Sequence, residues 1–227
     1  HHPTLAAHRV TLAYDGFTAL DDVTLSVPRG RITAVVGPNG AGKSTLFHCL
    51  AGTLRPDSGR ITLGTRDITR LPAHARTRSG MARTFQQLAV FPSLTVEENV
   101  RVGADQAGGA RTGAAHDRAL RLLALTDLAA RPAVDLSTGA LRRTELARAL
   151  AGGPHTLLLD EPAAGLDAAE AAALTTLLRA LVADGMALLV VEHDLDLVAG
   201  LADTVHVMTA GRIVASGPAD RVLEEVR

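Results

Sequence analysis

A glycine-rich stretch, GPNGAGKST at residues 37–45, has the composition of a phosphate-binding loop. It satisfies the pattern G-x-x-x-x-G-K-[ST], and it lies between a continuous apolar run and a helix-like pattern, the context in which this motif is meaningful. Its glycines let backbone N–H groups curl around an anion, and the N-terminus of the following helix adds partial positive charge. We therefore expect a nucleotide-phosphate site built from Gly37, Pro38, Asn39, Gly40, Ala41, Gly42, Lys43, Ser44 and Thr45.

A second stretch, LLLDEP at 157–162, could supply the acidic half of this site. A lone Asp-Glu pair is usually surface decoration, but here it ends an apolar strand and follows a phosphate loop. Lys43 would contact the β- and γ-phosphates, and the Ser44 hydroxyl would bind Mg²⁺. Asp160 would hold Mg²⁺ through water, and Glu161 would polarise an attacking water. These residue types predict Mg²⁺-dependent hydrolysis of a nucleoside triphosphate.

His193, in VVEHD, ends the next apolar run along the chain. A histidine at a strand end is by itself more often structural than catalytic. The carboxyl ends of parallel strands meet at one edge of a sheet, so this side chain is expected beside the γ-phosphate. We predict a role for His193 in hydrolysis.

The strands that must position these residues show two patterns. The runs at 9–14 and 23–27 alternate apolar and polar residues, as half-buried antiparallel strands do, and 59–64 is expected to be a short edge strand. Continuous apolar runs predict central, doubly covered strands at 31–37, 155–162 and 187–193. The stretch 204–217 is expected to be a hairpin.

Helical patterns alternate with these strands. Helices are expected at 42–50, 95–103, 116–128, 168–183 and 218–226, with 104–115 as a flexible connection. Thr95 is a plausible N-cap for the second of them. Alternating strands and helices indicate an α/β fold around a mostly parallel sheet.

The composition excludes several other classes of protein. The 227 residues are 47% apolar, which is enough to form a hydrophobic core. Only 2% are aromatic, so this core must be aliphatic. With 23 basic and 24 acidic side chains, the chain has no global field to attract nucleic acid. The lone Cys49 rules out an internal disulfide and favours a reducing compartment. No apolar run reaches the roughly 18–20 residues that cross a bilayer. The initial His-His is expected to be a tag remnant or an artificial boundary.

Six motifs in this order, GPNGAGKST, TFQ, LSTGA, LLLDEP, GLD and EHD, resemble the ATP-binding subunit of ATP-binding-cassette transporters over essentially the whole chain. The resemblance implies a P-loop NTPase core with an N-terminal antiparallel β subdomain. It further implies one domain over 3–227, in which 3–86 and 153–227 form the core and 87–152 form the helical signature subdomain. By this resemblance, the short tail that often closes such subunits is expected to be missing, through truncation or divergence.

The resemblance also implies roles for matching residues. Tyr14 matches the aromatic that stacks on adenine, and Gln86 matches the glutamine that reaches Mg²⁺ and senses the membrane partner. Glu161 matches the general base and His193 the switch histidine. Asp167, in GLD, matches an aspartate that bridges two subunits.

The turn LSTGA at 136–140 opens a helix whose first N–H groups attract anions. An ordinary capped helix would satisfy the same pattern. In the family this end, with Ser137 and Gly139, faces the γ-phosphate bound by a second ATP-binding subunit, so two composite sites form when two cassettes meet. Thr138 and Ala140 depart from the usual Leu-Ser-Gly-Gly-Gln. The loss of one hydrogen bond at Ala140 is expected to weaken this sandwich by about 1.5–3 kcal/mol and to leave a working, slower site.

A narrower likeness concerns the transported solute. ARTFQ at 82–86, LTVEENV at 94–100 and EPAAGLD at 161–167 are similar to the ATP-binding subunits of branched-chain amino acid importers, and urea and amide importers share much of this pattern. Such a subunit would bind transmembrane permeases at the cytoplasmic face of the membrane and serve a solute-binding protein indirectly. An exporter cassette, a DNA-repair or translation cassette, a nucleoside kinase and a weak regulatory cassette remain alternatives.

Overall fold

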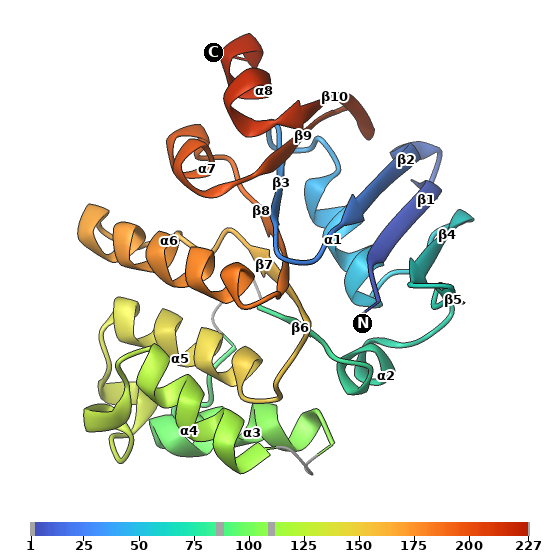
Figure 1. Ribbon diagram of the computed structural model, residues 1–227. Coiled ribbons are helices and arrows are strands. Elements are labelled where there is room, and N and C mark those ends of the chain that lie inside the picture. The colour runs from blue at the N-terminus through green and yellow to red at the C-terminus, as the bar shows by residue number, and fades with distance from the viewer. Residues whose placement is uncertain (1–2, 85–88, 109–111, 227) are drawn as a thin grey trace.

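The computed structural model describes residues 3–84, 89–108 and 112–226, whose strands form two sheets (Figure 1). The antiparallel sheet has the order β2-β1-β4-β5, with β1 at Leu5–Tyr14, β2 at Phe17–Val27, β4 at Ser58–Leu63 and β5 at Arg66–Asp67. The larger sheet has the order β10-β9-β3-β8-β7-β6, with β3 at Ile32–Val36, β6 at Met81–Arg83, β7 at Thr156–Asp160, β8 at Ala187–Val191, β9 at Thr204–Thr209 and β10 at Arg212–Pro218.

The neighbouring strands β3, β8 and β7 run parallel and form the centre of the larger sheet. Every residue in each of them is buried, as their continuous apolar runs predicted. Segments more than a hundred residues apart therefore end at one edge of the sheet. The phosphate loop follows β3, Asp160 ends β7, and Glu192 follows β8.

The helices cover both faces of this sheet and form a separate lobe. They are α1 at Lys43–Ala51, α2 at Ala73–Arg78, α3 at Val96–Gln106, α4 at Thr112–Leu122, α5 at Thr138–Leu150, α6 at Ala168–Ala183, α7 at Leu195–Leu201 and α8 at Ala219–Val226. One apolar core contains side chains of α1 and of both sheets, so α1 lies between them. A second core joins α3, α4 and α5 to α6 and the other face of the sheet.

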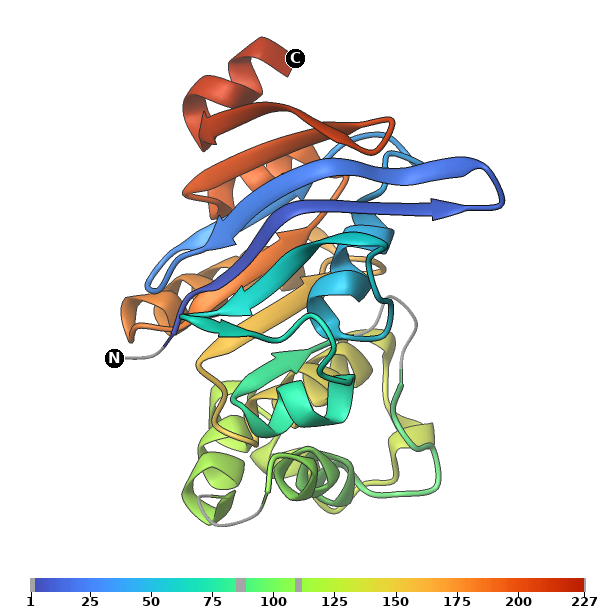
Figure 2. The ribbon, with the colours of Figure 1, turned by 90° about the vertical axis from the view of Figure 1, so that its right-hand side faces the viewer.

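Figures 1 and 2 show the lobe formed by α3, α4 and α5 (green and yellow) at the opposite side of the molecule from β10 and α8 (red). This arrangement confirms the predicted fold class, a mostly parallel sheet with an antiparallel sheet and a helical lobe. No helix among the described residues is long and apolar enough to cross a membrane.

The sequence-based boundaries were wrong in the middle of the chain. Residues 104–106 belong to α3 and 112–115 to α4, where a flexible connection was expected. The helix expected over 116–128 ends at Leu122, because Ala124 adopts a left-handed φ of 52° and a 3₁₀ turn follows at Thr126–Leu128. The turn places Leu125 in the core.

Four short elements, α2, β5, β6 and α7, were not predicted, and the strand expected at the edge of the antiparallel sheet lies inside it. β4 lies between β1 and β5, so the two-residue β5 forms that edge. Thr95 caps α3 as predicted: its side chain accepts from the N–H of Glu98, whose carboxylate accepts from the N–H of Thr95.

Candidate nucleotide site

The phosphate loop ends at Gly42, which begins α1 in a left-handed conformation with φ 102°. A Cβ at this position would lie 2.6 Å from the carbonyl oxygen of Ala19, so only glycine fits. Gly42 has no side chain that could cap the helix, and the first N–H groups of α1 are left for a ligand. The preceding residue, Ala41, packs into the protein: its side chain is buried, and its carbonyl accepts from the N–H of Gly211.

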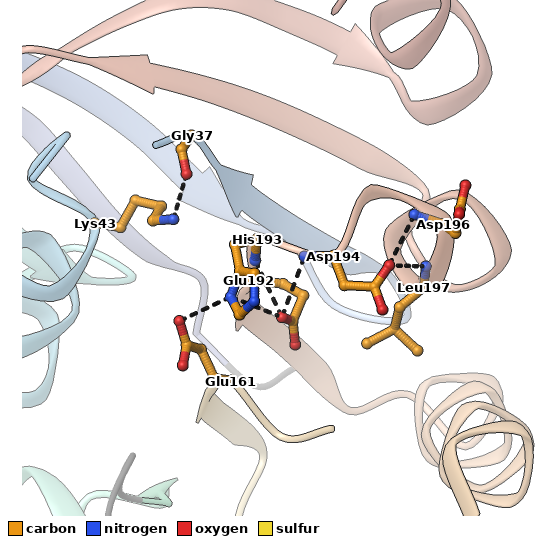
Figure 3. A network of polar contacts seen from close by, with 8 residues as sticks. All are labelled: Gly37, Lys43, Glu161, Glu192, His193, Asp194, Asp196 and Leu197. Atoms are coloured by element: carbon orange, nitrogen blue, oxygen red, sulfur yellow. Dashed lines mark hydrogen bonds and ion pairs between the residues drawn. The ribbon is translucent and has the colours of Figure 1, made fainter. Parts of the chain in front are cut away.

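Lys43, the first residue of α1, is buried beside the loop. Its Nζ donates to the carbonyl of Gly37 (Figure 3). Burial lowers the pKa of Lys43, while the nearby carboxylates Glu161, Glu192 and Asp160 act in the opposite direction. A bound phosphate would replace the Gly37 carbonyl as the partner of Lys43, and its negative charge would offset the desolvation of the buried ammonium.

Asp160 and Glu161 lie at the carboxyl end of β7. Desolvation, then Glu161 and Glu192, raises the pKa of the buried Asp160 carboxyl to about 6, and Lys43 partly offsets this. The N–H of Glu161 donates to the carbonyl of Val191 at 2.9 Å, which ties this turn to β8. Glu161 has a φ of 47°, a strained conformation for a residue with a Cβ and one that often occurs at functional sites.

His193 reaches Glu161 from the neighbouring strand end. Its Nδ1 donates to Glu161 Oε1 at 3.0 Å (Figure 3). Glu192, which the sequence analysis passed over, is 2% exposed, and its Oε1 accepts from the N–H groups of His193 at 3.0 Å and Asp194 at 3.4 Å. Burial raises the pKa of Glu192. The sequence signal for Glu192 was the run of three polar residues, 192–194, that directly follows a buried strand.

A cavity of about 380 Å³ joins the phosphate loop to the antiparallel sheet. It is lined by Tyr14, Phe17, Ala19, Asn39, Gly40, Gly42, Lys43, Ser44, Thr45, Asp160, Glu161 and Val191. Tyr14 and Phe17 are register partners at the hairpin between β1 and β2, and Phe17 is 66% exposed. Phe17 was also missed, although an aromatic three residues after Tyr14 is a signal in a chain with five aromatics.

The chemistry of this lining fits a nucleoside triphosphate with Mg²⁺. Two aromatic rings lie at the hairpin, where a base could stack. The uncapped helix end and Lys43 suit phosphate, and the Ser44 hydroxyl and Asp160 carboxylate are oxygen ligands of the kind Mg²⁺ takes. Gln86, the third metal ligand expected from the sequence, lies outside the described residues.

The signature residues are placed elsewhere. Ser137 caps α5, its Oγ accepting from the N–H of Ala140 at 3.2 Å, and Asp167 caps α6. Neither of these, nor Gly139, is among the described residues that line the cavity. Within one chain, the structure therefore brings together the phosphate loop, Asp160, Glu161 and His193, and leaves the signature turn apart from them.

Comparison with known proteins identifies the family. Residues 20–164 match the family model described as ABC transporter. The chain is 44% identical to the cobalt import ATP-binding protein CbiO of Rhodobacter capsulatus, over 98% of this chain and 81% of that protein. It is 36% identical to the high-affinity branched-chain amino acid transport ATP-binding protein LivG of Salmonella typhimurium, over 97% and 93%.

The solved dimeric structure of the ATP-binding cassette MJ0796, in a post-hydrolysis state with ADP and Pi, has a TM-score of 0.84 to this chain at 26% identity and covers 95% and 98% of the two chains. The predicted P-loop cassette fold is thus confirmed. The two relatives serve different solutes, so the family match leaves the solute open. The chain belongs to the ABC transporter family, as an ATP-binding cassette whose enzymatic activity is ATP hydrolysis with Mg²⁺.

Proposed function

We propose that Glu161 is the general base of ATP hydrolysis in this cassette and that His193 holds it in place. The observation that carries this proposal is the 3.0 Å contact between His193 Nδ1 and Glu161 Oε1 at the mouth of the phosphate loop. Both residues follow buried parallel strands, so the sheet fixes their separation. In this arrangement a water beside the γ-phosphate would lose its proton to the Glu161 carboxylate.

The remaining roles follow from the lining of the cavity. Mg²⁺, held by Ser44 and Asp160, would neutralise charge on the phosphates. Gln86 is a further ligand proposed from the sequence alone. Lys43 and the N–H groups of residues 39–45 bind the phosphates and stabilise the charge that develops as the bond to the γ-phosphorus breaks. Tyr14, with Phe17 beside it, stacks on the base. These roles are consistent with the burial of Lys43 and Asp160, because desolvated charges act strongly on a bound phosphate.

We further propose that two cassettes pair head to tail, so that Ser137, Gly139 and Asp167 of one chain complete the site of the other. The separation of these residues from the cavity within one chain supports this, as does the dimeric form of the MJ0796 cassette. The pair would bind permease subunits at the cytoplasmic face of the membrane, with residues 87–152 as the helical subdomain of a single domain over 3–227. Separation of the pair after hydrolysis would drive the permeases.

For the solute, we propose branched-chain amino acids or related small amino acids and amides. The likeness at 82–86, 94–100 and 161–167 supports this, as does the relation to LivG along 93% of that protein. Cobalt is the second candidate, because the chain is 44% identical to CbiO and 36% identical to LivG. Such uptake would also require a solute-binding protein.

The assignment of the base is tested with Glu161→Gln, which keeps the side-chain shape and removes the base. ATP turnover should fall by about a hundredfold or more, while ATP affinity, measured by calorimetry, should be retained. Glu224→Gln, on the exposed side of α8, is the matched control and should turn over ATP like the wild type. Turnover by Glu161→Gln at the wild-type rate would rule out this base.

The solute is tested by uptake. The chain is produced in Salmonella typhimurium without LivG and in Rhodobacter capsulatus without CbiO, and uptake of labelled leucine and of cobalt is measured. We expect leucine uptake to return, and the Glu161→Gln chain to restore nothing. Restored cobalt uptake without leucine uptake would overturn the amino-acid proposal in favour of the second candidate.

A further inference from the structure

Glu170, in the first turn of α6, contacts two elements through one carboxylate. Its backbone N–H donates to Asp167 Oδ1 at 2.8 Å, and its Oε1 accepts from the N–H of Asp167 at 3.5 Å, which makes a capping box. Its other oxygen, Oε2, lies against Gly139 in the first turn of α5. One side chain therefore touches both the segment with Asp167 and the signature turn.

The fit at Gly139 is tight. A Cβ at this position would overlap Glu170 Oε2 and lie 2.9 Å from Glu170 Cδ. The φ of Gly139 is not in the left-handed region, so the backbone itself would accept an alanine. Within this chain, the residue that requires glycine at 139 is Glu170.

Two neighbouring features make this contact the point where α5 and α6 can be fixed to each other. A Cβ on Gly165 would be 3.4 Å from Thr138 Cγ2, so the turn before α6 also lies against the start of α5. Beside this contact, a largely apolar cavity of about 430 Å³, lined by Leu146, Leu166 and Leu174 among others, separates the two helices. The first turn of α5 has no acidic residue of its own, and Glu170 supplies a carboxylate on its flank.

We propose that Glu170 is a positioning residue that clasps the start of α5 to the start of α6. The clasp keeps Ser137 and Asp167 at a fixed separation. The proposal rests on the proposed function, in which both residues contact the partner cassette. Glu170 touches no nucleotide in this scheme. Its effect is on pairing, because the two contact points of one chain must reach the partner together.

The contact itself is tested without nucleotide, by a double-mutant cycle on thermal unfolding with Gly139→Ala and Glu170→Ala. In the wild-type background Gly139→Ala should lower the midpoint temperature, because the new methyl displaces Glu170. In the Glu170→Ala background the same change should raise it by about a few degrees, since alanine is the better helix former. An equal loss in both backgrounds would overturn the clasp, whether or not the cassettes pair.

The consequence for pairing is tested in the hydrolysis-blocked Glu161→Gln background, by sedimentation with ATP and Mg²⁺. Glu170→Ala should weaken dimerisation by about five- to tenfold, with ATP affinity of the monomer unchanged, and Glu170→Gln should restore most of it. Glu98→Ala is the matched control, because it removes the capping-box glutamate of α3 and should leave pairing unaffected. Equal weakening by Glu98→Ala and Glu170→Ala would reduce Glu170 to an ordinary cap and overturn the proposal.

If the parent chain stays monomeric with ATP while the unfolding cycle shows the sign change, the proposed pairing fails and the contact stands. If the parent dimerises and Glu170→Ala dimerises equally well, the positioning role fails and the proposed function stands. The two failures are therefore distinguishable.

Discussion

Replacing Asp160 with asparagine should stabilise the nucleotide-free chain at neutral pH and remove its Mg²⁺-dependent activity. Asp160 is buried at the end of β7, where desolvation and the neighbouring Glu161 and Glu192 raise its pKa from 3.8 to about 6. Above pH 6 the folded chain must hold an ionised carboxylate in an environment that disfavours it. Asparagine keeps the shape and carries no charge.

The magnitude follows from the shift. A change of roughly two pKa units corresponds to about 3 kcal/mol. Because the folded state binds the proton more tightly than the unfolded state, the wild type should gain up to this free energy of unfolding as the pH falls from about 6 to about 4. The advantage of Asp160→Asn should therefore be about 3 kcal/mol at pH 7.5 and shrink towards zero near pH 4.

Urea unfolding followed by circular dichroism measures this directly, in buffers without nucleotide or Mg²⁺ and between pH 4 and 7.5. The exposed Glu224→Gln serves as control and should show no such pH-dependent advantage. Mg²⁺-dependent ATP hydrolysis should be lost in Asp160→Asn, because asparagine lacks the ionised oxygen that Mg²⁺ takes as a ligand. A wild type that is as stable as Asp160→Asn at pH 7.5, or a difference that does not change with pH, would refute the reasoning.

Three further outcomes are expected. Arg76→Ala should lower the free energy of unfolding by about 3 kcal/mol or more, measured by urea denaturation, because Arg76 is 1% exposed and its guanidinium donates to five carbonyl groups. Tyr14→Ala should raise the KM for ATP by about tenfold, and Phe17→Ala should raise it less, in steady-state assays; unchanged values would remove the aromatic pair from base binding. Ala140→Gln should strengthen ATP-driven dimerisation in sedimentation while destabilising the monomer by about 1 kcal/mol, since Ala140 is 4% exposed; unaltered dimerisation would mean that the position is idle.

The strongest sequence signals concerned residues whose neighbours in the chain decide their conformation. The apolar runs of β3, β7 and β8 are covered on both sides, so continuous hydrophobicity was sufficient to find them. The cap at Thr95 bonds to a residue three positions later, so its pattern is local as well. The adjacency of Asp160 and Glu161 to His193 followed from the rule that parallel strands end at one edge.

Features that depend on distant contacts were not accessible in this way. α2 is six residues long and is held by Arg76, whose partners Cys49 and Leu50 lie at the end of α1. The contact of Glu170 with Gly139 spans about thirty residues and joins two helices whose individual patterns are unremarkable. In the sequence, Glu192 looks like an ordinary polar loop residue. Only the fold buries it near Lys43, where its charge acts on the ammonium.

The two ends of α1 have different roles: the C-terminal end is stabilised by contacts within the chain, and the N-terminal end is available to bind a ligand. At its C-terminus, Arg76 donates to the carbonyls of Cys49 and Leu50, and the N–H of Gly52 donates to the carbonyl of His48. A cation at this end complements the helix dipole, so the chain satisfies the negative pole internally. At its N-terminus the cap is Gly42, which offers no side chain, and the positive pole is left for an anion. Arg76 thus stabilises the C-terminal end of α1, while Gly42 leaves the N-terminal end open. Loss of Arg76 should weaken nucleotide binding by loosening α1, because Arg76 lies at the end of the helix that faces away from the phosphate loop.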